Sequence, residues 1–368
     1  MDIWPRRLHQ MQNRALRGTF VLLLSVTLAF VPVHTRPALA CAFDMVKPER
    51  TLIDWIVDSD SLVLARPAAD NPFKFAVVDV LSGSAVPGPV THLVDSSTRR
   101  KLALHADDAV LFAEIANGEW RRVAYIDDPF RDVLHTALAH RNTWREAMPQ
   151  SRIDFLDALQ DTPDPRYRAI VIGELDKVSY AQLQTFDLRI PPEDLIAQLW
   201  TKEGYPYQAI HALLIGLSGT EDARAVISKA IRGAKGGAMP TNLGAFAAAY
   251  IELDGPAAIS ALAADILQDP AQSLEKLEQI IMALSVHQAL VDDVQQAAIN
   301  AAIARLVRDR PAAAEAVARQ FTRRGNWSQS ALLNELVRDR KLVSMDAYYT
   351  VALYLSEARN QQSAQNGG

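Results

Sequence analysis

The sequence repeats itself at an offset of 36 residues. The stretch 209–219 (AIHALLIGLSG) and the segment 221–227 align with 245–255 (AFAAAYIELDG) and the segment 256–267. Each copy has the pattern of a helix, a glycine turn and a second helix, with small residues where two helices would approach closely. Repeats of about 30 to 45 residues with this content are typical of helical hairpins stacked into an α-solenoid. The alternative interpretation is an irregular helical domain in which this single match arose by chance.

Helical signals continue on both sides of this repeat. Asp164-Pro165 and Pro191-Pro192 are typical helix starts, because proline at the first helical position costs no hydrogen bond. Further helices are expected at Leu274–Val286, Asp292–Val307, Pro311–Arg323, Ser330–Val337 and Asp346–Ala358. The whole region resembles degenerate HEAT-type repeats, in which Asp164-Pro165 followed by Arg168 is the usual start of a helix. The resemblance implies a HEAT-like helical-repeat domain over residues 163–359.

The region from Ser61 to about Asp128 has a different pattern, in which short β-branched or aromatic runs alternate with turn residues. Strands are expected at 61–66, 74–81, 90–94, 108–114 and 120–126, with Asn117-Gly118 as the last turn. This spacing predicts a small barrel or sandwich. A short amphipathic helix over 48–57 is expected before the first strand, since Leu52, Trp55 and Ile56 share one helical face.

Three segments of this region are SDSLVLAR at 59–66, VVDVLSG at 77–83 and ADDAVLFAEI at 106–115. Together with a cysteine at the expected mature N-terminus, they resemble bacterial netrin-like domains. Such domains look like the inhibitory domain of tissue inhibitors of metalloproteinases, so the resemblance implies an OB-type barrel over 41–128. In that family the first cysteine chelates the zinc of the target protease, and the matching position is Cys41. The family begins Cys-x-Cys, whereas this chain has Cys41-Ala42-Phe43 and no second cysteine.

The first forty residues have the three parts of a secretory signal peptide. Four arginines precede Gly18, an apolar run of about fifteen residues covers 19–33, and Ala38-Leu39-Ala40 offers small residues to a signal peptidase. The apolar run is shorter than the roughly twenty residues that span a bilayer. We therefore expect cleavage after Ala40, a mature chain beginning at Cys41, and a periplasmic protein of the Gram-negative type.

Cys41 is the only cysteine of the chain, which excludes an intramolecular disulfide. The alternative to a free thiol is a lipoprotein, because Ala38-Leu39-Ala40-Cys41 loosely resembles a lipobox. Only lipidation of Cys41 would bring the protein to a membrane. Removal of residues 1–40 leaves 328 residues with a net charge of −9. This mild acidity lacks the basic field that attracts nucleic acid.

The mature chain contains none of the common catalytic or metal-binding motifs. Its histidines are His92, His105, His135, His140, His211 and His287, and none stands in an H-E-x-x-H pattern. His211 lies on an apolar helical segment and is expected to be a buried core residue. Gly216-Leu217-Ser218-Gly219 shares letters with a nucleophile elbow, but its position predicts a left-handed helix cap. We expect no cofactor, metal or catalytic residue, although an enzyme whose site assembles from dispersed residues is an open alternative.

These patterns predict a multidomain α+β protein. The expected parts are a signal peptide (1–40), a netrin-like or OB-like β-module (41–128), a helical connector (129–162), a helical-repeat domain (163–359) and a disordered tail (360–368). The function that this organisation favours is non-catalytic binding of a protein partner through the repeats or the barrel. The alternative is inhibition of a metalloenzyme through Cys41.

Besides Cys41, two tyrosines are candidates for contact with a partner. Tyr205 and Tyr207 flank a proline at the expected start of a helix. An aromatic pair in this position is expected either to fill the space between helices or to form an exposed contact.

Overall fold

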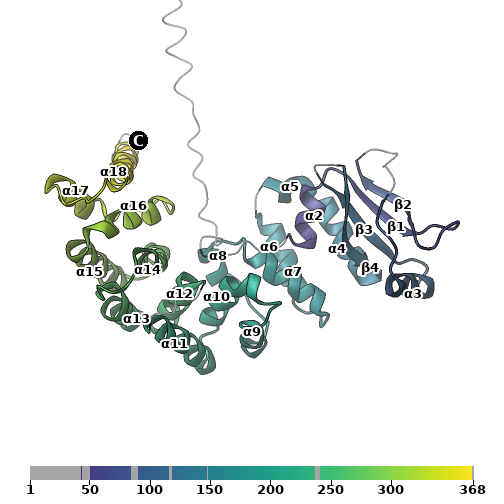
Figure 1. Ribbon diagram of the computed structural model, residues 1–368, viewed down its shortest axis with the longest axis horizontal. Coiled ribbons are helices and arrows are strands. Elements are labelled where there is room, and N and C mark those ends of the chain that lie inside the picture. The colour runs from purple at the N-terminus through teal and green to yellow at the C-terminus, as the bar shows by residue number, and fades with distance from the viewer. Residues whose placement is uncertain are drawn as a thin grey trace, which may run out of the picture. The chain divides into compact units, whose positions relative to one another are not determined.

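The structure is a computed structural model that describes Phe43 and residues 50–83, 90–115, 118–146, 148–236 and 241–366. It is mostly helical, with one small sheet near the N-terminal end of the described chain (Figure 1). This agrees with the α+β composition that the sequence predicts. Ala38, Ala40 and Cys41, and with them the expected cleavage site, lie outside the described residues. Within those residues, no helix is both long and apolar enough to cross a membrane.

Four antiparallel strands form the sheet, in the order β2-β1-β3-β4. They are β1 (Leu62–Pro67), β2 (Phe75–Ser82), β3 (Ala109–Glu114) and β4 (Trp120–Ile126), each within one residue of a predicted strand. Side chains of β3 alternate between two cores, because successive residues of a strand point to opposite faces. Val110 and Phe112 pack with Leu102 of α3 (Ser96–Leu104), whereas Leu111 and Ala113 join the large core of the helical part.

The prediction of a strand at 90–94 is wrong. In this segment Leu93 forms an isolated bridge with Lys74, and the Val94 N–H donates a hydrogen bond of 2.9 Å to the Phe73 carbonyl. The chain then enters α3, because the carboxylate of Asp95 accepts hydrogen bonds from two backbone N–H groups of the first turn. The helix therefore begins directly after the segment.

On the face of the sheet opposite α3, α2 (Leu52–Asp58) and α4 (Asp128–Ala139) contact β4. Three further helices follow α4 and pack on other helices: α5 (Arg141–Glu146) on α2 and α4, and α6 (Gln150–Leu159) against α7 (Pro165–Leu175). Thr51 caps α2, Asp127 caps α4 and Asp164 caps α7. Because Pro165 takes the first helical position after Asp164, the predicted helix start at this pair is confirmed.

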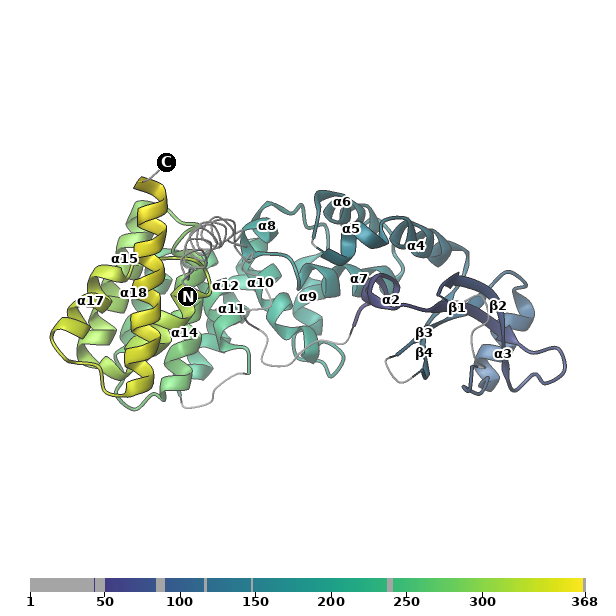
Figure 2. The same cartoon turned by 90° about the horizontal axis from the view of Figure 1, so that it is seen from above.

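The remaining elements are helices. They are α8 (Tyr180–Thr185), α9 (Pro192–Gln198), η2 (Tyr205–Tyr207), α10 (Gln208–Ser218), α11 (Glu221–Lys235), α12 (Leu243–Asp254), α13 (Pro256–Leu262), η3 (Ala263–Leu267), α14 (Leu274–His287), α15 (Asp293–Asp309), η4 (Pro311–Ala313), α16 (Ala314–Thr322), α17 (Ser330–Arg338) and α18 (Met345–Asn366). Helices α10, α12, α14, α16 and α18 pack side by side in that order (Figures 1 and 2). The intervening helices α11, α13, α15 and α17 each contact this row.

The predicted repeat corresponds to the hairpins α10–α11 and α12–α13. In both, a glycine with a positive φ ends the first helix: Gly219 has φ 66° and Gly255 has φ 54°. Gly219 is the left-handed cap that its position predicts. Gly216 allows the close approach of α10 to α12, since a Cβ atom there would lie 2.7 Å from Cα of Ala249. The small residues of the repeat are therefore at helix contacts.

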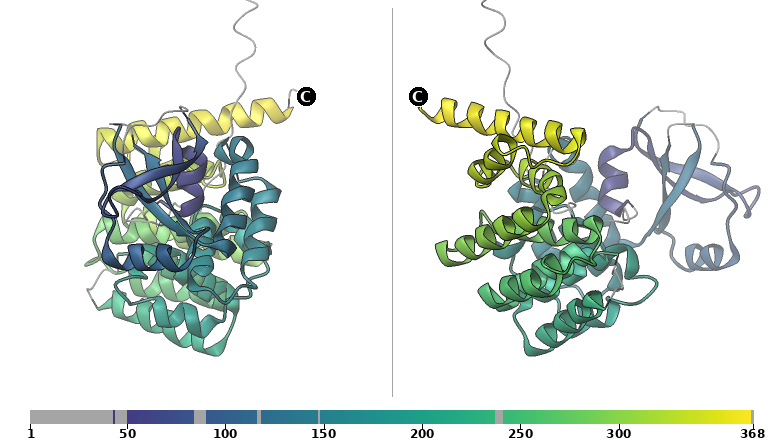
Figure 3. Two further views of the ribbon diagram at one scale, coloured as in Figure 1. Left: turned by 90° about the vertical axis from the view of Figure 1, so that its right-hand side faces the viewer. Right: turned by 60° about the vertical axis from the view of Figure 1, so that its left-hand side comes forward.

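Helix α18 lies at the C-terminal end of the row (Figure 3). Helix α18 continues to Asn366, into the segment for which the sequence predicts a disordered tail from residue 360. Glutamine, serine and alanine are compatible with a helix, and extending an existing helix avoids the cost of nucleation.

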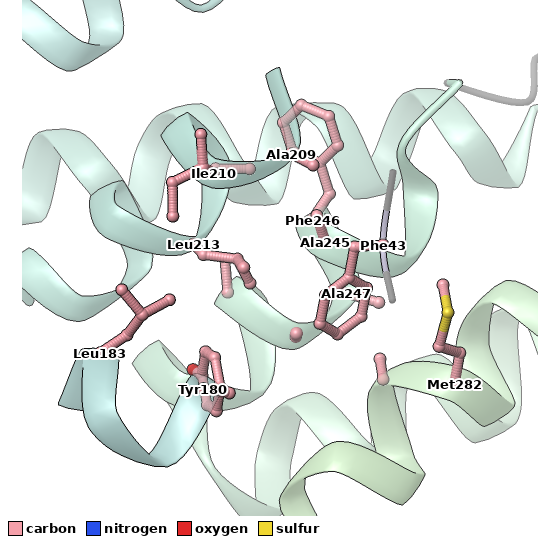
Figure 4. Close-up of a cluster of buried hydrophobic side chains, with 14 of the residues drawn as sticks. Phe43, Tyr180, Leu183, Ala209, Ile210, Leu213, Ala245, Phe246, Ala247 and Met282 are labelled. Carbon is pink, nitrogen blue, oxygen red and sulfur yellow. The ribbon is translucent and has the colours of Figure 1, made fainter. Parts of the chain in front are cut away.

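Phe43 is buried in the helical row although it precedes the sheet in the chain. Its side chain is 1% exposed and lies beside Gly244 of α12, near Met282 of α14 (Figure 4). A Cβ atom on Gly244 would lie 3.1 Å from the Phe43 ring. One core cluster thus contains residues from Phe43 to Tyr354 of α18.

Candidate functional site

The two tyrosines named from the sequence have different environments. Tyr207 is half-buried, and its ring lies 3.4 Å from the position that a Cβ atom on Gly173 would take. It fills the space between η2 and α7. Tyr205 is exposed, and its hydroxyl lies 3.0 Å from that of Thr241. Tyr205 is therefore the one of the pair that a partner could contact.

The histidines in the described part of the chain lie in separate environments. His211 and His287 are buried in the helical part, and burial lowers the pKa of each to about 4. The predicted burial of His211 is confirmed. His135 and His140 are exposed, and the His140 ring stacks on Trp144. In the described part of the chain, no three His, Cys, Asp or Glu side chains are placed to hold a metal ion.

A cleft of about 600 Å³ lies where the end of α3 meets the end of β4 and the first turns of α4 and α7. Its polar lining consists of Lys101, His105, Asp108, Tyr125, Asp127, Asp128 and Arg166. These residues come from distant parts of the sequence, and the capping of α4 and α7 brings several of them to one place. Of this set, the sequence patterns point only to His105, and only as one histidine among several.

Tyr125 and Asp108 form part of the cleft wall. The Tyr125 hydroxyl donates a hydrogen bond of 2.6 Å to Oδ2 of Asp108. Burial, and then this hydrogen bond to a carboxylate, raise the pKa of Tyr125 to about 12. The phenol therefore stays protonated at neutral pH and acts as a hydrogen-bond donor, not as a base.

Arg166 connects the caps of two helices at the cleft. Its guanidinium donates hydrogen bonds to Asp164 at 2.6 Å and to Asp127 at 2.8 Å, and it lies 4.1 Å from the Phe130 ring centroid. The hydrogen bond to Asp164, followed by that to Asp127, raises the pKa of Arg166. The Arg166 charge is therefore paired within the protein, and Tyr125 is held as a hydrogen-bond donor.

A second surface is apolar and lies at the C-terminal end of the helical row. Val343, Met345, Tyr348, Tyr349 and Leu353 are large apolar residues with exposed side chains, and we call this set the α18 surface. Met345, Tyr349 and Leu353 are four residues apart, so they form one stripe along the helix. Their exposed fractions are 63%, 64% and 56%.

The opposite side of α18 is also apolar, and it is buried. Ala347, Val351, Tyr354 and Ala358 are at most 2% exposed, and α18 packs on α16 and α17. The Tyr354 hydroxyl accepts a hydrogen bond from the Gln329 backbone N–H and donates one to the Asn326 carbonyl. A helix that is apolar on both sides is usually buried on both sides.

The apolar α18 surface continues into a cavity of about 380 Å³ between α17 and α18. Leu336, Leu342, Val343, Met345 and Tyr348 line it, with Arg340 and Ser344 among the polar groups of its lining. In protein interfaces, anchoring side chains of a partner typically fill pockets that lie beside exposed apolar residues. No motif in the sequence indicates this surface, because the spacing of its residues also fits an ordinary buried helix face.

The sequence matches no known family model, and no curated protein or solved structure is significantly similar to it.

Proposed function

We propose that the protein is an exported, non-catalytic binding protein, which contacts a protein partner through the α18 surface. The observation that carries the proposal is the exposed stripe of Met345, Tyr349 and Leu353 on the last helix of the row. Soluble repeat proteins usually end in a helix with a polar outer face. An apolar outer face is typical of a surface that a partner covers.

The architecture of the helical part supports this proposal. Five helices pack in a row, and two consecutive hairpins share the same glycine position at their turn. We propose that this part is an α-solenoid, a fold whose function is often to present an extended surface to a partner. The sheet is antiparallel and its β1–β2 and β3–β4 pairs contain register shifts, which curve a sheet and are consistent with an OB-like module.

Export is proposed from the signal-like first forty residues. Intact-mass measurement on the protein from the exported fraction tests it. A mass that begins at Cys41 is expected; a chain that begins elsewhere contradicts the assignment, and an added diacylglycerol mass would favour the lipoprotein alternative.

The partner is tested by crosslinking in cells. A photoreactive amino acid replaces Tyr349 in the full-length exported protein, and in a matched control it replaces Lys229, an exposed residue of α11. We expect one discrete adduct with a second protein from position 349 and none from position 229. The purified partner should then bind the Leu353→Ser variant at least about tenfold more weakly, because the lost apolar contact is worth more than 1.4 kcal/mol.

Two results would contradict this function. One is the absence of any adduct from position 349. The other is an adduct that consists of two copies of this chain, which would mean that the α18 surface mediates self-association. Because Tyr349 and Leu353 are exposed, neither change should shift the midpoint of unfolding, and that midpoint serves as the folding control.

A further inference from the structure

The cleft at α3, β4, α4 and α7 contains charged groups that the fold does not use. Lys101 and His105 are exposed, and in the described part of the chain no ion pair or hydrogen bond holds either side chain. The Lys101 ammonium lies over the Tyr125 ring, 5.5 Å from its centroid. Asp128 is almost fully exposed, and its contact with Arg131 is a long one of 3.9 Å.

Other residues already satisfy the backbone groups at the end of α3 and the start of α4, where these side chains lie. Arg66 donates hydrogen bonds to backbone carbonyls of Leu102 and His105 at the end of α3, at 2.7 Å and 3.2 Å. Asp127 caps the N-terminus of α4 through the Phe130 N–H. Lys101, His105 and Asp128 are therefore not needed to satisfy backbone groups, and the Lys101 ammonium, the His105 imidazole and the Asp128 carboxylate are available to a ligand.

The available charges are separated by sign. The α3 wall carries the ammonium of Lys101 and the imidazole of His105, and the α4 wall carries the carboxylate of Asp128. Between them, Tyr125 and Asp108 are fixed to each other. A ligand that matches both walls has a negative group toward α3 and a positive group toward α4. The volume of about 600 Å³ is within the range of about 300 to 1,000 Å³ that small-molecule sites occupy.

We propose that this cleft binds a small zwitterion of the size of a short peptide. Its carboxylate contacts Lys101 and His105, and its ammonium contacts Asp128. This binding site is separate from the α18 surface, so a negative result for one proposal does not contradict the other.

The test uses trialanine as the probe, with two analogues that each lack one charge. N-acetyl-trialanine has no ammonium, and trialanine amide has no carboxylate. Binding to the full mature protein is followed by saturation-transfer NMR and calorimetry. We expect saturable binding of trialanine, and binding of each analogue about fivefold weaker, since each exposed charge contact contributes modestly.

Two variants assign the ends of the ligand. Lys101→Gln should weaken trialanine and N-acetyl-trialanine about fivefold and leave the amide unchanged. Asp128→Asn should weaken trialanine and the amide, and leave the N-acetyl form unchanged. Lys229→Gln and Asp222→Asn, at exposed positions of α11, are the matched controls and should change nothing.

The proposal is overturned if trialanine shows no saturable binding, or if all three probes bind equally well. It is also overturned if the two cleft variants bind all probes as the unchanged protein does. The comparison of the three probes uses the unchanged chain, so it decides the question even if a variant fails to fold.

Discussion

Arg152 donates hydrogen bonds from both Nε and Nη2 to one carboxylate oxygen of Glu174, whose side chain is completely buried. The other Glu174 oxygen accepts from the Thr51 hydroxyl and, at 2.7 Å, from the ammonium of Lys177. Lys177 also lies 2.5 Å from Asp54. Burial favours the neutral form of Asp54, but the charge and hydrogen bond of Lys177, the Thr51 N–H and the Arg152 charge together outweigh burial and lower the Asp54 pKa. This network joins α2, which precedes the sheet, to α6 and α7.

Replacing Glu174 with alanine should destabilise the protein by about 3 to 5 kcal/mol, because the buried Arg152 charge would lose its closest charged partner and keep only a long ion pair of 3.8 Å with Asp54. Urea unfolding followed by circular dichroism measures the change. Asp309→Ala is the control: its pair with Arg305 is about 60% exposed on both sides and should be worth less than about 1 kcal/mol. Equal losses for the two variants would show that the Glu174 network does not hold α2 to the helical part.

Acid should destabilise the protein through His211 and His287. The native pKa of each is about 4, whereas an unfolded histidine titrates near 6.5. Between these values the unfolded chain binds protons that the native chain does not, so stability falls as pH decreases from 6.5 to about 4. The full effect is on the order of 3 kcal/mol for each residue.

The variant His287→Gln isolates one of these contributions. His287 lies against the Tyr180 ring, its Nε2 lies 3.0 Å from the Ala248 carbonyl, and Glu252 is the nearby carboxylate. The variant should lose part of the slope of unfolding free energy against pH between 6.5 and 4, whatever its stability at neutral pH. His135→Gln, at an exposed position, should keep the full slope. An unchanged slope in His287→Gln would mean that this histidine is charged in the native state.

Helices with caps and an apolar stripe were predictable from the sequence to within a few residues. Asp164 before Pro165, and Gly219 at the end of α10, are local signals whose effect does not depend on the rest of the fold. Helix α3 was not predicted, because its first residues are polar and only Thr98 and Leu102 are buried. Its start depends on the Asp95 cap, and the apolar pattern of 90–94 directly before Asp95 indicates a strand instead.

The cleft could not be predicted from the sequence for a different reason. Lys101, Tyr125 and Arg166 come from three elements, and only the packing of α3, β4 and α7 brings them together. The α18 surface shows the reverse case. The apolar spacing of Met345, Tyr349 and Leu353 is visible in the sequence, but only the structure shows which of the two apolar sides of α18 is buried.

Phe43 should contribute strongly to stability although it precedes the sheet. Phe43→Ala would leave a cavity between α12 and α14 beside Gly244 and Met282, at a cost of about 3 to 5 kcal/mol. The control is Phe73→Ala, because that ring is 57% exposed and its removal should cost less than about 1 kcal/mol. Thermal unfolding of the mature protein measures both. A small effect of Phe43→Ala would mean that this side chain is not docked in solution.

Two helical glycines should respond to alanine with opposite signs. At Gly216 the new Cβ would lie 2.7 Å from the Cα and Cβ atoms of Ala249, so α10 and α12 would have to separate. We expect Gly216→Ala to cost about 1 to 3 kcal/mol, the range for overpacking a core. At Gly233, within α11, no described atom other than those of the adjacent residues and the helix's own backbone lies within 4 Å of the new Cβ. Gly233→Ala should therefore stabilise the protein by about 0.5 to 1 kcal/mol, because alanine loses less backbone entropy in a helix.

Urea unfolding of the two variants side by side separates packing from helix propensity, since the chemical change is the same. If Gly216→Ala were also stabilising, α10 and α12 would not be in close contact. The packing of α10 on α12, with which the row of helices begins, would then be wrong, and the binding proposal would lose that support. If instead Gly233→Ala were destabilising, α11 would pack against a neighbour at that position. Changes of opposite sign in the free energy of unfolding are expected only if α10 packs closely on α12 and α11 has open space at Gly233.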